Sequence, residues 1–180
     1  APVHMVGKVG NDSFAEQYLS YFKKEGIDIS YIKREESVST GIAVIEVEPS
    51  GENHIVLVPG ANDLVDPHYS DTISTSFDAQ SIVLLQLEIP TETVFHTLKA
   101  AKAKGAVTIL DHAPAQVLPE EFYQYIDYLT PNSTEISVLS EMPADTDKQL
   151  HTAADHLLSK GARTIIAKRG ERGASVFSAE

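Results

Sequence analysis

The sequence has no cysteine, no long hydrophobic run and too few basic side chains to balance its acidic ones. The absence of cysteine excludes disulfides and zinc sites built on thiolates. No apolar run approaches the ~20 residues that cross a membrane. With 14 basic and 26 acidic side chains, the net charge is −12. This argues against binding to nucleic acids or anionic membranes, because both require a positive surplus. The balance fits a cytoplasmic protein.

Several signatures of enzymes and of export are missing as well. There is no Gly-x-Gly-x-x-Gly fingerprint, no P-loop and no Gly-x-Ser-x-Gly elbow. Residues 1–6 lack the basic and apolar regions of a signal peptide, so we expect none. The histidines are scattered, and the spacing of His151 and His156 misaligns them on a predicted helix. We therefore expect no metal cage.

The first part of the chain predicts a strand, a helix and a hairpin. The expected elements are a strand at 3–9, a helix at 14–25, an extended segment at 27–34 and two strands at 41–48 and 54–58. Gly26 ends the helix. A polar turn at 49–53 joins the last two strands, so they are expected to pair antiparallel.

From residue 66 onward, predicted strands and helices alternate. Apolar runs predict strands at 82–86, 107–110, 128–130 and 164–168. Helical spacing predicts helices at 91–104, 120–126, 133–140 and 147–160. This alternation predicts right-handed crossovers in a parallel sheet with helices on both faces. The 180 residues suffice for one buried domain or most of a larger one.

Ligands of open parallel sheets bind where the strands end. Each of the four predicted strands runs into a polar or glycine-rich segment, namely 87–88, 111–115, 131–135 and 169–173. One such end means little, but four together indicate a ligand cleft. Glu88 could accept hydrogen bonds from sugar hydroxyls or be a solvated strand end, and its position alone does not separate the two.

Residues 129–135 form a strand-to-helix turn in which Asn132 or Ser133 can cap the helix. Such a helix start suits phosphate or metal-bound phosphate. An ordinary capping box with Glu135 explains the same residues, and this stretch alone favours that explanation.

Asp111 and His112 are neighbours at a strand end, so their side chains are expected on opposite faces and not as an acid/base pair. We expect His112 at the surface or behind the site. Gly170 and Gly173 would let a backbone approach an anion, although a tight hairpin into 174–177 needs the same glycines.

Taken in order, these segments resemble the ribokinase family, also called the phosphofructokinase B family of sugar kinases. The matching segments are Gly7–Phe14, Ser39–Ala43, Gly51-Glu52-Asn53, Val58–Asn62, Leu85–Glu88, His112–Ala115, Leu129–Glu135 and Gly170–Gly173. They cover essentially the whole chain.

The resemblance implies a three-layer α/β/α fold with a mainly parallel sheet and a small antiparallel β lid at about 37–59. Residues 1–180 would be the central part of one ribokinase-like domain. The implied reaction transfers the γ-phosphoryl group of ATP, with Mg²⁺ and possibly a monovalent cation, to a sugar hydroxymethyl group, ribose first among candidates. The lid would also support a homodimer.

The resemblance also implies roles for single residues. Those expected at the sugar are Ala43, Ile45 and Glu88. Those expected at ATP are Asn132, Lys168, Gly170 and Gly173, and Glu135 would hold magnesium through water. No catalytic residue is assigned, because the base lies in a motif that the sequence lacks.

Departures from the family pattern qualify these roles. The sequence lacks the N-terminal Gly-Gly-Lys-Gly-x-Asn and the C-terminal Asp-Thr-x-Gly-Ala-Gly-Asp segments, so the chain alone is expected to be inactive. Asp111 stands where ribokinases usually have Asn, and Lys168 where they tend to have Thr. A negative Asp111 near phosphates would need magnesium or a cation beside it. The alternative function is a non-catalytic sugar- or nucleotide-binding protein of the same fold.

Overall fold

The computed structural model describes residues 1–49 and 53–178. Part of the predicted turn at 49–53, with Gly51-Glu52 of the matching segment, lies outside the described residues. The chain divides into two compact units. The first comprises Ala1–Ile73 and Glu88–Pro90, and the second Ser74–Leu87 and Thr91–Glu180.

In the first unit, the predicted strand and extended segment pair with each other. Strand β1 (His4–Gly10) lies parallel to β2 (Asp28–Glu35), and α1 (Ser13–Lys24) connects them. The helix begins at Asp12, whose carboxylate accepts the Ala15 N–H at 2.9 Å. Its predicted end is confirmed, because Gly26 adopts a φ of 74° that other residues avoid.

One helix of this unit has no counterpart in the prediction. Helix α2 (Pro67–Ser74) buries only Ser70 and Ile73, which is too weak an apolar pattern to identify from sequence. Its Tyr69 hydroxyl lies 2.5 Å from the carbonyl oxygen of Tyr31 and 3.1 Å from that of Gly7. The helix is thereby fixed to both strands of the pair.

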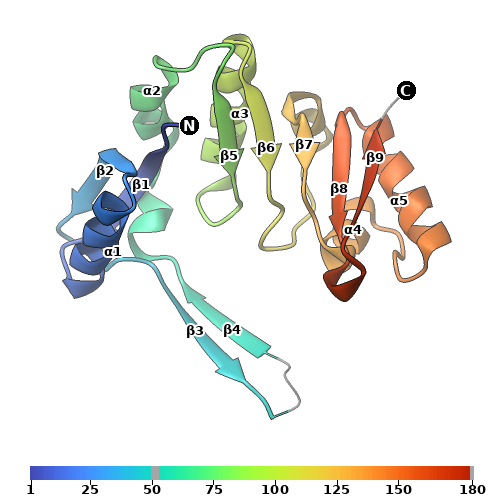
Figure 1. Ribbon diagram of the computed structural model, residues 1–180, viewed down its shortest axis with the longest axis horizontal. Helices are drawn as coiled ribbons and strands as arrows, with labels where there is room; N and C mark the ends of the chain where they lie inside the picture. The colour runs from blue at the N-terminus through green and yellow to red at the C-terminus, as the bar shows by residue number, and fades with distance from the viewer. Residues whose placement is uncertain (50–52, 179–180) are drawn as a thin grey trace. The chain divides into compact units, whose positions relative to one another are not determined.

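The predicted hairpin is confirmed (Figure 1). Strand β3 (Ile42–Val47) pairs antiparallel with β4 (Asn53–Val58), in a register that sets Ala43 opposite Leu57 and Ile45 opposite Ile55. Its apolar side chains are exposed, with Val47 at 68%. We call this two-stranded ribbon the lid hairpin.

The second unit contains a five-stranded sheet in the order β5-β6-β7-β8-β9 (Figure 1). Its strands are β5 (Ile82–Leu85), β6 (Val107–Leu110), β7 (Tyr128–Leu129), β8 (Thr164–Lys168) and β9 (Ala174–Ser178). The first four run parallel, and β9 returns antiparallel to β8. The mainly parallel sheet and the tight hairpin at 170–173 are therefore both confirmed.

Helices of the second unit lie between successive strands. They are α3 (Thr91–Ala103), α4 (Ser133–Ser140) and α5 (Asp147–Ser159), while the predicted helix at 120–126 is a 3-10 helix at Glu120–Tyr125. Alternate strand residues such as Leu110, Leu129 and Ile165 are fully buried. None of the helices within residues 1–49 and 53–178 has the length and hydropathy to cross a membrane.

Candidate functional site

Three neighbouring strands bring polar side chains together at their carboxyl ends. Asp111 follows β6, Thr130 follows β7, and Lys168 ends β8. The ammonium Nζ of Lys168 lies 2.7 Å from Oδ1 of Asp111, and the Thr130 hydroxyl donates to the same oxygen at 3.0 Å. The cation that a negative Asp111 requires is thus supplied by the protein itself.

The turn into α4 is a complete capping box. Glu135 donates its backbone N–H to Oδ1 of Asn132 at 2.9 Å. In return, its carboxylate accepts the Asn132 backbone N–H at 2.6 Å and the Asn132 side-chain amide at 2.9 Å. The ordinary explanation of this motif, a helix cap, is therefore confirmed, and any role at magnesium or phosphate comes in addition.

Glu135 also belongs to the strand-end cluster. Its side chain is only 10% exposed, and its Oε2 lies 3.9 Å from Nζ of Lys168. We call Asp111, Thr130, Glu135 and Lys168 the strand-end cluster. Its two carboxylates face one ammonium, so one negative charge is left uncompensated within it.

The strand-end cluster fits a magnesium ion that keeps most of its water ligands. Mg²⁺ prefers oxygen ligands, keeps several of its waters, and is commonly held by one or two carboxylates together with substrate phosphates. Asp111 and Glu135 are of that type. Among the described residues no group of three or more His, Cys, Asp or Glu side chains could hold a metal ion. The cluster therefore suits a hydrated ion that arrives with phosphates.

The loop after β8 is open to a ligand. Gly170 and Gly173 have φ angles of 58° and 75°, and a Cβ atom at either would meet nothing within 4 Å. The loop closes on itself, because Arg169 donates its N–H to Gly173 O at 2.8 Å and Gly173 donates to Gly170 O at 3.0 Å. These glycines serve the hairpin and also leave the backbone accessible.

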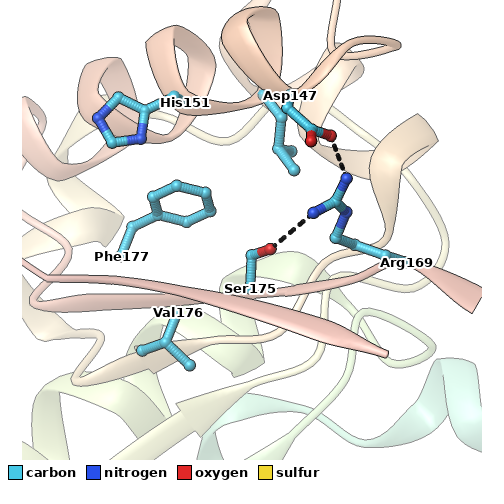
Figure 2. A pocket seen from close by; sticks show the side chains of 7 residues that line it. Asp147, His151, Arg169, Ser175, Val176 and Phe177 are labelled. Atoms are coloured by element: carbon cyan, nitrogen blue, oxygen red, sulfur yellow. Dashed lines mark hydrogen bonds and ion pairs between the residues drawn. The ribbon is translucent and has the colours of Figure 1, made fainter. Parts of the chain in front are cut away.

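The back of this loop is anchored to α5, which sequence reasoning missed. Figure 2 shows the Arg169 guanidinium between Asp147, the first residue of α5, and Ser175 of β9. Arg172 reaches the same Asp147 carboxylate at 3.2 Å. Both arginines are thus directed to Asp147, whereas their neighbour Lys168 is directed to Asp111.

A pocket of about 390 Å³ lies beside that anchor. Ser175 and Phe177 line it from one side of β9, while Val176 points to the other side, as expected for alternating strand residues (Figure 2). The His151 ring meets the Phe177 ring edge-on at 5.3 Å. The pair forms the aromatic wall of the pocket.

Of the two positions expected for His112, at the surface or behind the site, the surface is wrong. The side chain is fully buried, and its Nε2 donates to the Gln116 carbonyl oxygen at 2.7 Å, tying down the loop after β6. Burial lowers the pKa of the His112 imidazole and thereby favours its neutral form. Strand alternation separates it from Asp111, as predicted, and no acid/base pair forms.

The residues expected at the sugar belong to the first unit. Ala43 and Ile45 lie on one face of the lid hairpin and are exposed, as is Glu88 in the bend after β5. Their roles at a sugar remain predictions.

Three of the matching segments meet where the lid hairpin begins and ends. Asp12 accepts the Thr40 backbone N–H at 2.7 Å and the Thr40 hydroxyl at 2.8 Å. Ser39 O accepts the Ala61 N–H at 2.9 Å. Gly10 must lack a side chain, because a Cβ atom there would lie 2.4 Å from the Thr40 nitrogen. These segments fix both ends of the lid hairpin.

Comparisons with known proteins agree with this arrangement. The model of the pfkB family carbohydrate kinases matches residues 1–180. The chain is 37% identical over 181 residues to a ribokinase of Schizosaccharomyces pombe, covering 98% of this chain and 57% of that protein. It is 34% identical over 173 residues to a deoxyribokinase of Salmonella typhi, covering 96% of this chain and 56% of the relative.

The solved structures that it resembles include ribokinases. Arabidopsis thaliana ribokinase complexed with ribose and ATP matches with a TM-score of 0.85 and 29% identity, over 98% of this chain and 58% of that one. Thermotoga maritima ribokinase matches with a TM-score of 0.80 and 36% identity, over 98% and 57%. The chain thus spans a little over half the length of these relatives, and its fold is ribokinase-like. It belongs to the pfkB family of carbohydrate kinases.

Proposed function

We propose that this chain is part of an ATP-dependent kinase that phosphorylates the hydroxymethyl group of a sugar in the cytoplasm, converting ribose to ribose 5-phosphate. The observation that carries the proposal is the strand-end cluster beside the open Gly170–Gly173 loop. Family membership and the ribokinase and deoxyribokinase relatives support it.

The residues of the second unit would hold the nucleotide. Bound ATP supplies the phosphoryl group, and Mg²⁺ offsets phosphate charge. The Lys168 ammonium, which is paired with Asp111, would offer a point charge to the phosphates of the magnesium complex, and the backbone at Gly170 and Gly173 would allow close approach. Asn132 and Glu135 orient each other through the capping box, leaving the Glu135 carboxylate to meet a hydrated ion from a fixed position.

The residues of the first unit would hold the sugar. Glu88 is an exposed carboxylate, suited to accept hydrogen bonds from two neighbouring hydroxyls. Ala43 and Ile45 would cover the apolar face of the sugar ring. We assign neither the general base nor a monovalent-cation ligand to this chain, because its sequence lacks the motif that supplies the base.

Calorimetric titration of the chain with ribose, and separately with ATP and Mg²⁺, tests the proposal. Glu88→Ala should weaken ribose binding about tenfold, a loss typical of a hydrogen bond to a charged group, and leave ATP binding unchanged. Glu92→Ala is the matched control, since it removes an exposed carboxylate from the start of α3.

The outcomes separate the candidate functions. A chain that binds neither ribose nor ATP contradicts the proposal. Binding of either ligand without turnover, in a protein that carries all family motifs, would favour a non-catalytic binding protein. Titration with 2-deoxyribose distinguishes the sugars, because a site that hydrogen-bonds the 2-hydroxyl discriminates strongly against a substrate that lacks it.

A further inference from the structure

Asp111 and Lys168, two oppositely charged residues at the strand ends, are partners. They lie 57 residues apart in the chain, yet Nζ of Lys168 is 2.7 Å from Oδ1 of Asp111. Together they form a charged pair of zero net charge.

The charges around the Asp111–Lys168 pair leave a small net charge that one substitution would change. Glu135 contributes a second carboxylate, with Oε2 at 3.9 Å from the same ammonium. The nearest cations along the chain, Arg169 and Arg172, are both directed to Asp147 instead. Asp111 is 32% and Lys168 44% exposed, so an incoming phosphate can reach them. With the pair intact, the strand-end cluster keeps the single negative charge of Glu135.

We propose that Asp111 and Lys168 act as one charge-compensated unit that sets the preference of the nucleotide site for the magnesium complex over metal-free nucleotide. This inference rests on the proposed nucleotide-binding function. Asp111 engages the ammonium that would otherwise bind phosphate directly, and the remaining negative charge repels metal-free ATP. Bound magnesium would reverse both effects, because it would neutralise phosphate charge, and the carboxylates of Asp111 and Glu135 would help to hold it.

Opposite single substitutions should therefore move this preference in opposite directions. Asp111→Asn frees the ammonium, and metal-free ATP should bind at least about threefold more tightly, since unit charges a few ångströms apart interact strongly near a protein surface. Lys168→Thr leaves two uncompensated carboxylates, so metal-free ATP should bind at least about threefold more weakly, and Mg²⁺ alone more tightly. The double variant Asp111→Asn/Lys168→Thr should return the preference to that of the parent.

The measurement is an NMR titration of the isotope-labelled 180-residue chain, which reports dissociation constants in the millimolar range. ATP is added once with excess Mg²⁺ and once with a chelator, and the ratio of the two constants is compared between variants. Asp155→Asn and Lys104→Thr are controls that change the net charge equally, at exposed positions on α5 and after α3. Asp111→Ser is a second neutral variant should Asp111→Asn fold poorly.

The results distinguish this inference from the proposed function. Opposite shifts with restoration in the double variant support it. Equal ratios in all variants, shifts in the same direction, or a double variant that keeps either single shift would overturn it, while the nucleotide-binding function stands. A parent chain that binds neither form of ATP would overturn both.

Discussion

Asp127 joins three elements of the second unit through one buried carboxylate. It accepts hydrogen bonds from Lys102 of α3 at 2.8 Å, from the Thr108 N–H of β6 at 2.9 Å and from Arg163, just before β8, at 3.2 Å. Burial raises the pKa of the Asp127 carboxyl, but the hydrogen bonds from Lys102, Thr108 and Arg163 outweigh it, and the net shift is downward. Folding therefore favours the ionised form.

The lowered pKa of Asp127 sets the sign of a pH dependence. Its stabilising contribution is fully present above the unfolded value of about 3.9 and is lost as pH falls through the folded pKa. Asp127→Asn should lower the free energy of unfolding at pH 7 by about 2 kcal/mol, and the difference from the parent should shrink in acid. Urea unfolding at several pH values measures this, with exposed Asp63→Asn as control. A deficit independent of pH would contradict the argument.

Gly60 is the second residue with a specific energetic role. Its φ is +55°, and a Cβ atom would lie 2.4 Å from the Ser39 carbonyl oxygen. Gly60→Ala should destabilise the first unit by about 1–3 kcal/mol because it combines backbone strain with a backbone clash. Gly7→Ala is the matched control, since a Cβ atom at Gly7 meets nothing within 4 Å. If urea unfolding gave both variants the same free energy of unfolding as the parent, this role for Gly60 would be refuted.

At the scale of elements, the lid hairpin has two apolar faces. Residues directly opposite in an antiparallel pair share a face. One face carries Ala43, Ile45, Val47, Ile55 and Leu57, and the other carries Ile42, Val44, Val56 and Val58. Exposure of either apolar face to water is unfavourable, and the face with Ala43 and Ile45 is proposed to cover the sugar. We propose that the other face, with Val44 and Val56, contacts a second copy of the chain.

Neighbouring residues of β4 test this homodimer. Val56 and Ile55 are 59% and 53% exposed and lie on opposite faces, so a lysine at either is tolerated by the fold. Val56→Lys should sediment as a monomer, because a charge would be buried in the contact, whereas Ile55→Lys should sediment with the parent dimer. A monomeric parent, or a Val56→Lys variant that remains dimeric, would contradict the proposed interface.

Most elements could be predicted from sequence because the relevant forces are local. Short apolar runs identified the strands, and the helices predicted at 91–104 and 147–160 do end just before Gly105 and Gly161, which both have positive φ. Helix α2 was not predicted because its buried face has only two residues.

The site was predicted less completely, because its contacts depend on the order of strands. The pairing of Lys168 with Asp111 requires β6, β7 and β8 to be neighbours, which no local pattern reports. The anchor of Arg169 to Asp147 and the burial of His112 depend on tertiary packing in the same way.

At the scale of the whole molecule, the proposed kinase activity would require segments that this sequence lacks. It contains the strand-end cluster proposed to meet the nucleotide, but neither of the two segments expected from the family resemblance, the C-terminal one with the base and the N-terminal one for the sugar. The 180-residue chain should therefore show no phosphorylation of ribose above background, because the sugar hydroxyl has no acceptor for its proton. A coupled assay of ADP release, with host kinases excluded, measures this. ATP-dependent turnover by the isolated chain would disprove it.

The capping box gives the molecule a reporter of its own. The Glu135 oxygen that accepts the backbone N–H of Asn132 at 2.6 Å belongs to the carboxylate proposed to meet a hydrated metal ion. A cation that polarises this carboxylate weakens its hydrogen bond with the backbone N–H of Asn132, so the first turn of α4 opens more often. The backbone amide proton of Asn132 should then exchange with solvent faster as Mg²⁺ is added. Its exchange rate would therefore report how much of the site is occupied by metal, without substrate or turnover.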